Sequence, residues 1–427
     1  MQKTRYKLIK EDGYLLLIFF LMSISILIKS HYNNCGSLSF DSIGYLELAK
    51  NLVNDEGFYG PYNWHEEKDT YFSIQPIGYP YTIYLTAKLT GLSVFWASKI
   101  LNMFLVGSIL HVFRLLFNKN AYLFGLILLF ASFIEIYSYT WSETLFISSL
   151  VWFSTSIYFF FVTEKKPFIS ASLLIISSVI LFLSRYIGAF SVGLIGVLGV
   201  FYVIKKNTMK ASILFTIVVI NLLIISTYLY INYIETGYIT GAYRRPATSG
   251  NLKLLKNLFK AIITESVIPF NDLRFYAKLF LFCQCSILTY TLLKYKNAII
   301  KPLKASKIND EVKIGLIFAI VGVTYLFFII VFRWNLKFNW WGFRLLGPSS
   351  FMLFIASLIF MKNYTRPLLY SNLKKIWIAL AIISWIINVP YHTYMHSGTR
   401  NCEDFVLKAK ELYSESGEDK FLNKQGK

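Results

Sequence analysis

The chain has 427 residues, of which 56% are hydrophobic and only 15% are charged. This composition leaves too little polar surface to solvate a globule of that size, so it excludes an ordinary water-soluble protein and indicates an integral membrane protein. The formal net charge of +20 does not indicate a nucleic-acid partner, because the Lys and Arg residues gather in short segments between alternate apolar runs, as topology signals do.

Apolar windows close to the roughly 20 residues that a bilayer requires recur along the chain. With the basic segments between them, they predict an all-α polytopic membrane protein of about eleven transmembrane helices. The predicted spans lie near residues 13–29, 94–117, 120–138, 141–163, 167–184, 187–204, 211–233, 275–294, 313–333, 345–361 and 374–391. Basic residues before the first span place the N-terminus in the cytoplasm, and the odd count places the C-terminus outside.

One transmembrane domain is predicted over residues 1–391, followed by a short polar extracytoplasmic tail over residues 392–427. Two longer loops map outside, at residues 30–93 and 234–274, and acidic residues outnumber lysines in the first part of the first loop. The first apolar run lacks a small-residue cleavage pattern, so it is interpreted as an uncleaved anchor.

The first outer loop is expected to hold two juxtamembrane helices. Asp41 opens a short amphipathic helix directly after the first span, and a carboxylate at that boundary invites a functional interpretation. Glu47 falls on the opposite side of this helix and is expected to be solvated. The apolar stretch at residues 79–91 is too short to cross a bilayer comfortably, so we expect it to lie on the outer surface.

The second outer loop carries Arg244 and Arg245 and a stretch around residues 252–263. It is interpreted either as part of an acceptor site or as an amphipathic helix lying on the membrane. Among the four cysteines, Cys35 and Cys402 both map outside, and a disulfide between them stays an open question.

The sequence has no phosphate-binding Gly-rich loop, no His-Glu-x-x-His pair, no Gly-x-Ser-x-Gly elbow and no cysteine pairs at zinc spacing. An ATP-driven or zinc-dependent mechanism therefore has no support. No cofactor is predicted, and a divalent metal stays open, although the acidic residues do not follow a ligand pattern.

Ionisable side chains gather at one predicted membrane level, the outer ends of the spans. They are Asp41, Glu135, Glu143, Arg185, Arg333 and Arg344. Such side chains usually face a protein interior or a water-filled cavity and pair with each other. We therefore expect a polar chamber that opens outward, with a mixed charge suited to a phosphate-bearing ligand.

Three of these residues need separate interpretation. Arg185 lies in a connection too short to be a free solvated loop, so a buried partner is expected. Arg333 is equally well explained as an arginine that snorkels beside an interfacial aromatic belt. Glu143 also fits a helix start, where acidic residues are favoured.

A series of short motifs then resembles a known family. The motifs, in chain order, are Asp41 to Ala49 with Tyr45 inside it, Gln75-Pro76-Ile77-Gly78-Tyr79-Pro80, Ser142-Glu143-Thr144-Leu145-Phe146, Arg185-Tyr186-Ile187-Gly188 and Arg344-Leu345-Leu346-Gly347-Pro348. Together they resemble the GT-C superfamily of integral-membrane glycosyltransferases, particularly the bacterial branch similar to protein O-mannosyltransferases and the lipid A aminoarabinose transferase. Two positions depart from that pattern: Ser42 stands where many relatives carry a second acid, and Gly44 stands where some carry a basic residue.

The resemblance implies an inverting glycosyltransferase that moves a sugar from a polyprenyl-phosphate-linked donor to a hydroxyl of a glycolipid, a cell-surface polysaccharide or a protein. It implies a bacterial inner membrane, an active site at its outer face, and Asp41 as the general base. The arginines implied to contact the donor phosphate are Arg185, Arg344 and Arg333. Further candidate site residues are Tyr45, Glu143, Gln75, Tyr79, Tyr186, Arg244 and Arg245.

Two other functions stay open at this point. A membrane polysaccharide polymerase or ligase would depend on Arg244 and Arg245 and leave Asp41 dispensable. A flippase would move a lipid-linked saccharide without changing its covalent structure, and the acidic motif of the first loop would then need another explanation.

Overall fold

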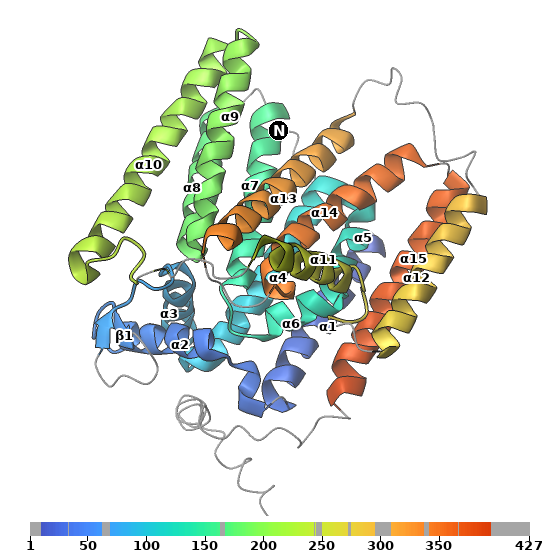
Figure 1. Ribbon diagram of the computed structural model, residues 1–427, viewed down its shortest axis with the longest axis horizontal. Helices are drawn as coiled ribbons and strands as arrows, with labels where there is room; N and C mark the ends of the chain where they lie inside the picture. Colours follow the sequence, from blue (N-terminus) through green and yellow to red (C-terminus); the bar gives the residue numbers. More distant parts are fainter. Residues whose placement is uncertain are drawn as a thin grey trace, which may run out of the picture.

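Long apolar helices make up most of the computed structural model, which describes residues 10–32, 34–61, 69–162, 167–242, 244, 250–271, 275–294, 309–336, 341–365 and 367–393. In Figure 1 the helices α8, α9 and α10 stand together on one side of the molecule, and α12 and α15 stand on the other. The short elements α2, α3 and β1 lie below the ends of α8 to α10.

The long helices follow the predicted spans closely. They are α1 (Lys10–Tyr32), α4 (Val94–Phe117), α7 (Glu143–Val162), α8 (Pro167–Ser184), α9 (Phe190–Ile204), α10 (Thr208–Thr236), α12 (Phe275–Lys294), α13 (Asp310–Asn335), α14 (Phe343–Tyr364) and α15 (Pro367–Ile386). Within the described residues, eight helices are long and apolar enough to cross a membrane, which makes the chain a multi-pass membrane protein. The apolar part of α8 is shorter and α12 is not among the eight, so the count of eleven stays a prediction.

The predicted span at residues 120–138 is not one continuous helix. The chain turns through η2 (Asn118–Asn120) and continues as α5 (Ala121–Gly125), η3 (Leu126–Leu129) and α6 (Ala131–Ser138). Phe130 is extended between η3 and α6, and the backbone N–H of Ala131 donates to the carbonyl of Ile268, 3.1 Å away. A segment between α11 (Asn251–Glu265) and α12 therefore replaces a helical hydrogen bond at the break.

Ion pairs at the helix ends show which ends lie together. Arg114, near the end of α4, pairs with Asp12 at the start of α1. Lys29, near the end of α1, pairs with Glu135 of α6. The two pairs fit the predicted alternation of helix direction, in which α1 and α6 finish at the same end of the bundle as α4 begins.

Glycine residues let α13 and α14 pack closely. Gly315 and Gly322 lie seven residues apart on one face of α13. A Cβ atom at Gly322 would stand 2.9 Å from the Cβ of Met352 on α14, so the backbones approach where only glycine fits. Beside them, the rings of Phe146 on α7 and Tyr325 on α13 lie 5.3 Å apart in the core.

The segment between α1 and α4 folds into a cap of short elements: η1 (Asn34–Ser37), α2 (Phe40–Val53), β1 (Tyr59–Pro61), β2 (Asp69–Tyr71) and α3 (Gly78–Thr90). The two strands pair antiparallel, with Tyr59 opposite Tyr71. Helix α3 has 13 residues and is therefore about 20 Å long, too short to span, as the sequence predicts. It ends at Gly91, whose φ of +68° is left-handed.

A capping box starts α2. The Ser39 hydroxyl accepts from the N–H of Ser42, and the Ser42 hydroxyl accepts from the N–H of Ser39. This places Asp41 in the first turn, where the helix dipole favours a carboxylate. The expectation that Glu47 is solvated is wrong: it is 8% exposed, because α2 packs against β1, α3 and α4 on several sides.

Helix α11 (Asn251–Glu265) forms where the sequence indicates an amphipathic helix as one of two alternatives, and Figure 1 shows it crossing in front of the bundle. Its buried side packs on α14, where Leu258 and Ala261 cluster with Leu346. The remaining short elements are η4 (Tyr186–Ala189) between α8 and α9, and η6 (Ile387–Tyr391) after α15.

Candidate active site

Four of the six predicted ionisable residues form one ion-pair cluster. Arg344 donates from Nη2 to Oδ2 of Asp41 at 2.7 Å and from Nε to Oε1 of Glu143 at 2.9 Å. Arg185 pairs through Nη1 with the same Oε1 of Glu143 at 2.5 Å. Residues separated by up to 303 positions therefore meet, and Arg185 has the buried partner that its short connection predicts.

Each member comes from the end of an element, so the cluster lies where several helices finish or begin. Asp41 is in the first turn of α2, Glu143 opens α7, and Arg344 is in the first turn of α14. Arg185 stands between α8 and η4 in an extended conformation. The next turn needs Gly188, since a Cβ there would lie 2.2 Å from the carbonyl oxygen of Leu181.

Burial differs sharply within the cluster. The Glu143 side chain is 1% exposed, whereas Arg185, Arg344 and Asp41 are 21%, 31% and 34% exposed. Glu143 is thus the most buried member, and its negative charge offsets the repulsion between the two guanidinium groups. Within the described residues, Oδ1 of Asp41 and the Nε and Nη2 of Arg185 make no hydrogen bond, so both signs of charge retain binding capacity at the exposed side.

The ring of Trp141, which the sequence analysis did not single out, packs against Arg344. The guanidinium carbon of Arg344 lies 4.1 Å from the ring centroid of Trp141, a cation–π arrangement. The indole N–H of Trp141 donates to the hydroxyl of Ser39 at 2.7 Å, and Ser39 caps the helix that carries Asp41. The signal in the sequence was the position of Trp141, two residues before Glu143.

Tyr45 and Tyr79 lie beneath the cluster and are fully buried. The Tyr45 hydroxyl donates to Ser142 at 2.9 Å, and the Tyr79 hydroxyl donates to the side-chain oxygen of Asn102 at 3.0 Å. Burial raises the pKa of both phenols, and the neighbouring Asp41 carboxylate raises the pKa of Tyr45 further. Both tyrosines therefore stay protonated and act as hydrogen-bond donors.

A second group of predicted residues holds the backbone between β2 and α3. The Tyr186 hydroxyl donates to the carbonyl of Ser73 at 2.6 Å, and Nη2 of Arg244 donates to the carbonyl of Ile74 at 2.7 Å. Gly241, at a φ of +72°, packs so tightly on Ser73 that a Cβ would lie 2.3 Å from its carbonyl carbon. Gln75 follows in this segment and is half-buried. Arg244 thus has a structural contact that explains it without catalysis.

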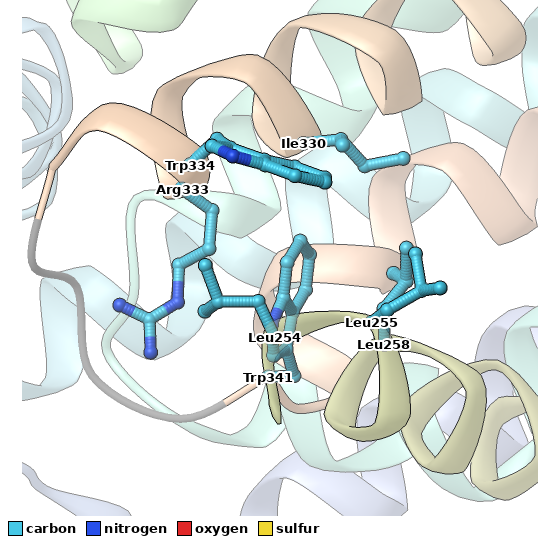
Figure 2. A pocket seen from close by; sticks show the side chains of 7 residues that line it. All are labelled: Leu254, Leu255, Leu258, Ile330, Arg333, Trp334 and Trp341. Atoms are coloured by element: carbon cyan, nitrogen blue, oxygen red, sulfur yellow. The ribbon is translucent and has the colours of Figure 1, made fainter. Parts of the chain in front are cut away.

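Arg333 lies outside the cluster, at the edge of a groove between α11 and the end of α13. Figure 2 shows its guanidinium pointing away from the leucines of α11, with Trp334 and Trp341 on either side of the groove. Its Nε is buried and has no partner among the described residues. This placement fits the interfacial interpretation of Arg333, and its contact with a donor phosphate stays a prediction.

The remaining candidates fall elsewhere. Glu135 pairs with Lys29 and not with the cluster arginines. Arg245 and Cys402 lie outside the described residues, as does the side chain of Cys35. In the part of the chain that the structure describes, no group of three or more His, Cys, Asp or Glu side chains could hold a metal ion.

The architecture is similar to the folds of two solved proteins, which agrees with the fold that the motif resemblance predicts. The chain is similar over 95% of its length to ArnT from Cupriavidus metallidurans bound to undecaprenyl phosphate, with a TM-score of 0.54 and 12% identity, covering 69% of that chain. It is also similar to the oligosaccharyltransferase of Archaeoglobus fulgidus tethered with an acceptor peptide, with a TM-score of 0.50 and 12% identity. This match covers 95% of the present chain and 58% of the oligosaccharyltransferase. No protein-family model and no curated protein matches the sequence.

Proposed function

We propose that the chain is an inverting glycosyltransferase that moves a sugar from a polyprenyl-phosphate-linked donor to a hydroxyl acceptor at the outer face of a bacterial inner membrane. The observation that carries the proposal is the cluster of Asp41, Glu143, Arg185 and Arg344 at the helix ends of a GT-C fold. The acceptor hydroxyl belongs to a glycolipid, a polysaccharide or a protein.

The arginines supply the donor site. A guanidinium group presents several N–H donors in a plane and binds phosphate in a forked geometry. Arg185 and Arg344 are held side by side by the shared oxygen of Glu143, so their positions are set before a donor arrives. The polyprenyl chain enters from the surrounding lipid, where its apolar units are already dissolved.

Asp41 supplies the base. Its Oδ2 is fixed by Arg344, which leaves Oδ1 to accept a proton from the acceptor hydroxyl. As that oxygen forms a bond to the anomeric carbon, the bond from that carbon to the phosphate oxygen breaks. The donor phosphodiester becomes a polyprenyl monophosphate with one more negative charge, which Arg185 and Arg344 stabilise.

Base assistance of this kind contributes typically about 10²–10⁴-fold to a rate. Because the hydroxyl attacks the face opposite to the departing phosphate, the product has the inverted anomeric configuration. A product anomer identical to that of the donor rules out the single displacement.

The competing functions receive less support from the geometry. The polymerase or ligase depends on Arg244, whose contact with the Ile74 carbonyl is structural. A flippase, which changes no covalent bond, does not require Asp41, Glu143 and the two arginines to be held together.

The deciding experiment measures transfer of radiolabelled sugar from a panel of polyprenyl-phosphate monosaccharides in membranes that contain wild type or Asp41→Asn at matched abundance. The amide keeps the shape of the carboxylate and cannot act as the base, so we expect transfer to fall by about 10²-fold or more while donor binding is retained.

The matched control is Asp55→Asn. Asp55 is an exposed aspartate just beyond α2 with a φ of +62°, a conformation that asparagine tolerates. This variant keeps wild-type transfer. Undiminished transfer by Asp41→Asn removes Asp41 from the mechanism and shifts attention to Arg244 and the polymerase function.

A further inference from the structure

Helix α4 looks like an ordinary membrane span, yet its outer end carries three buried polar side chains. Ser98, Lys99 and Asn102 are each fully buried and lie within about one turn of one another. Burying polar groups at such a place costs free energy unless every group has a partner. Most of their partners lie at residues 137–144, where α6 ends and α7 begins.

That segment needs partners of its own. Helix α6 ends at Ser138 and α7 begins at Glu143, so the last carbonyls of α6 have no following helical N–H to bind. Lys99 donates from Nζ to the carbonyl of Ser138 at 2.8 Å and to the hydroxyl of Thr140 at 3.2 Å.

Asn102 makes the most complete set of contacts. Its Nδ2 donates to the carbonyls of Tyr137 and Tyr139 at 2.8 and 2.9 Å. Its Oδ1 accepts from the hydroxyls of Tyr79 and Thr144, each at 3.0 Å. Since carbonyls only accept, the orientation of the amide is fixed, and all four of its hydrogen-bonding positions are used.

Residues 139–144 deliver three groups to the ion-pair cluster. Trp141 stacks on Arg344, Ser142 accepts from Tyr45, and Glu143 joins Arg344 to Arg185. We propose that Asn102, supported by Lys99, is a positioning residue that sets where residues 139–144 hold Glu143 and Trp141 against the two arginines. The proposal rests on the proposed function for its effect on transfer, but its structural part is independent of it.

The test compares Asn102→Ala with Asn221→Ala. Asn221 is an equally buried asparagine on α10 whose Nδ2 donates within its own helix to Ile217, so both changes remove the same atoms from a buried site. Tyr79→Phe is the milder companion, because it removes one of the two hydroxyl donors to Asn102 and keeps the ring.

Two readouts are needed. The first is hydrogen–deuterium exchange of the backbone amides in residues 139–144, which does not depend on any substrate. We expect it to rise about ten-fold or more in Asn102→Ala and to stay unchanged in Asn221→Ala. The second is sugar transfer, which we expect to fall by about 10²-fold in Asn102→Ala, since a displacement of about 1 Å at a reacting centre has an effect of that size.

A double-mutant cycle separates positioning from a general loss of stability. In a Glu143→Gln background the effect of Asn102→Ala on transfer shrinks to less than about three-fold, because the group that it positions is already lost. If the two effects simply multiply, or if Asn102→Ala leaves exchange or transfer unchanged, the proposal is overturned. If wild type transfers no sugar, the proposed function fails, and the exchange result alone decides whether Asn102 fixes the segment.

Discussion

Two ion-pair sites lie at the same end of the helix bundle, and they are built differently. In the cluster of Asp41, Glu143, Arg185 and Arg344, one buried carboxylate oxygen serves two arginines that are 21% and 31% exposed. The pair of Lys29 and Glu135 joins one cation to one anion, and the Lys29 side chain is 0% exposed. The first site keeps unused donors at an accessible side, as ligand binding requires, while the second is closed and can only hold α1 to α6.

The largest expected effect comes from Arg344→Lys. A lysine keeps the charge, but a single ammonium cannot form the forked contacts to Asp41 and Glu143 or present a flat face to Trp141. We expect sugar transfer to fall by about 10²–10³-fold, measured in membranes at matched abundance.

Its control is Arg114→Lys at the opposite end of the bundle, where Arg114 pairs with Asp12. This variant keeps transfer within about two-fold of wild type, since its site has no role in binding. If Arg344→Lys and Arg114→Lys lose transfer equally, then the effect comes from replacing any paired arginine and not from the position of Arg344 in the cluster.

An effect on stability alone is expected from Lys29→Met. The change leaves Glu135 without its cation in a largely buried place and destabilises the protein by about 3–5 kcal/mol. Thermal unfolding in detergent measures this loss, and transfer per folded molecule stays near wild type. The double variant Lys29→Met with Glu135→Gln recovers most of the stability, because no uncompensated charge remains. A loss of transfer without a loss of stability would place Glu135 in the active site after all.

The sequence predicted two kinds of feature: the position of single helices, and the membrane level of the charged residues at their ends. Long apolar runs gave the helices, and α4 and α8 have the predicted boundaries of 94–117 and 167–184. The position of charged residues at span ends predicted that Asp41, Glu143, Arg185 and Arg344 would lie at one level. It could not separate them from Glu135 and Arg333, because membrane level says nothing about which side of the bundle a residue faces.

Contacts between distant segments were harder to foresee. Lys99 and Asn102 interrupt an otherwise apolar run, and an ionisable residue inside a span is itself a signal. Their partners are mostly backbone carbonyls, which no sequence pattern reports. The break at Phe130 was missed for the same reason, since a carbonyl from residue 268 completes it.

Glu265 is a buried acid without an ion pair among the described residues, and it extends the comparison between the two ion-pair sites. Its substitution has the smallest effect expected, a change in how stability depends on pH. Glu265, at the end of α11, is 8% exposed and accepts from the hydroxyl of Ser132 at 3.1 Å; it has no ion pair among the described residues. Burial without a cation raises its pKa from 4.5 to about 7, despite hydrogen bonds that lower it. The folded state therefore favours the protonated acid.

Because the pKa of Glu265 is higher in the folded state than in the unfolded state, its protonation stabilises the fold at low pH, and this contribution is lost as pH rises from about 4.5 to 7. The full difference is roughly 3 kcal/mol. We expect Glu265→Gln to unfold at the same temperature as wild type near pH 5 and at a higher one near pH 8, since the amide remains neutral. An identical pH dependence in both proteins would mean that Glu265 is charged in the fold and has found a cation, as Glu135 has.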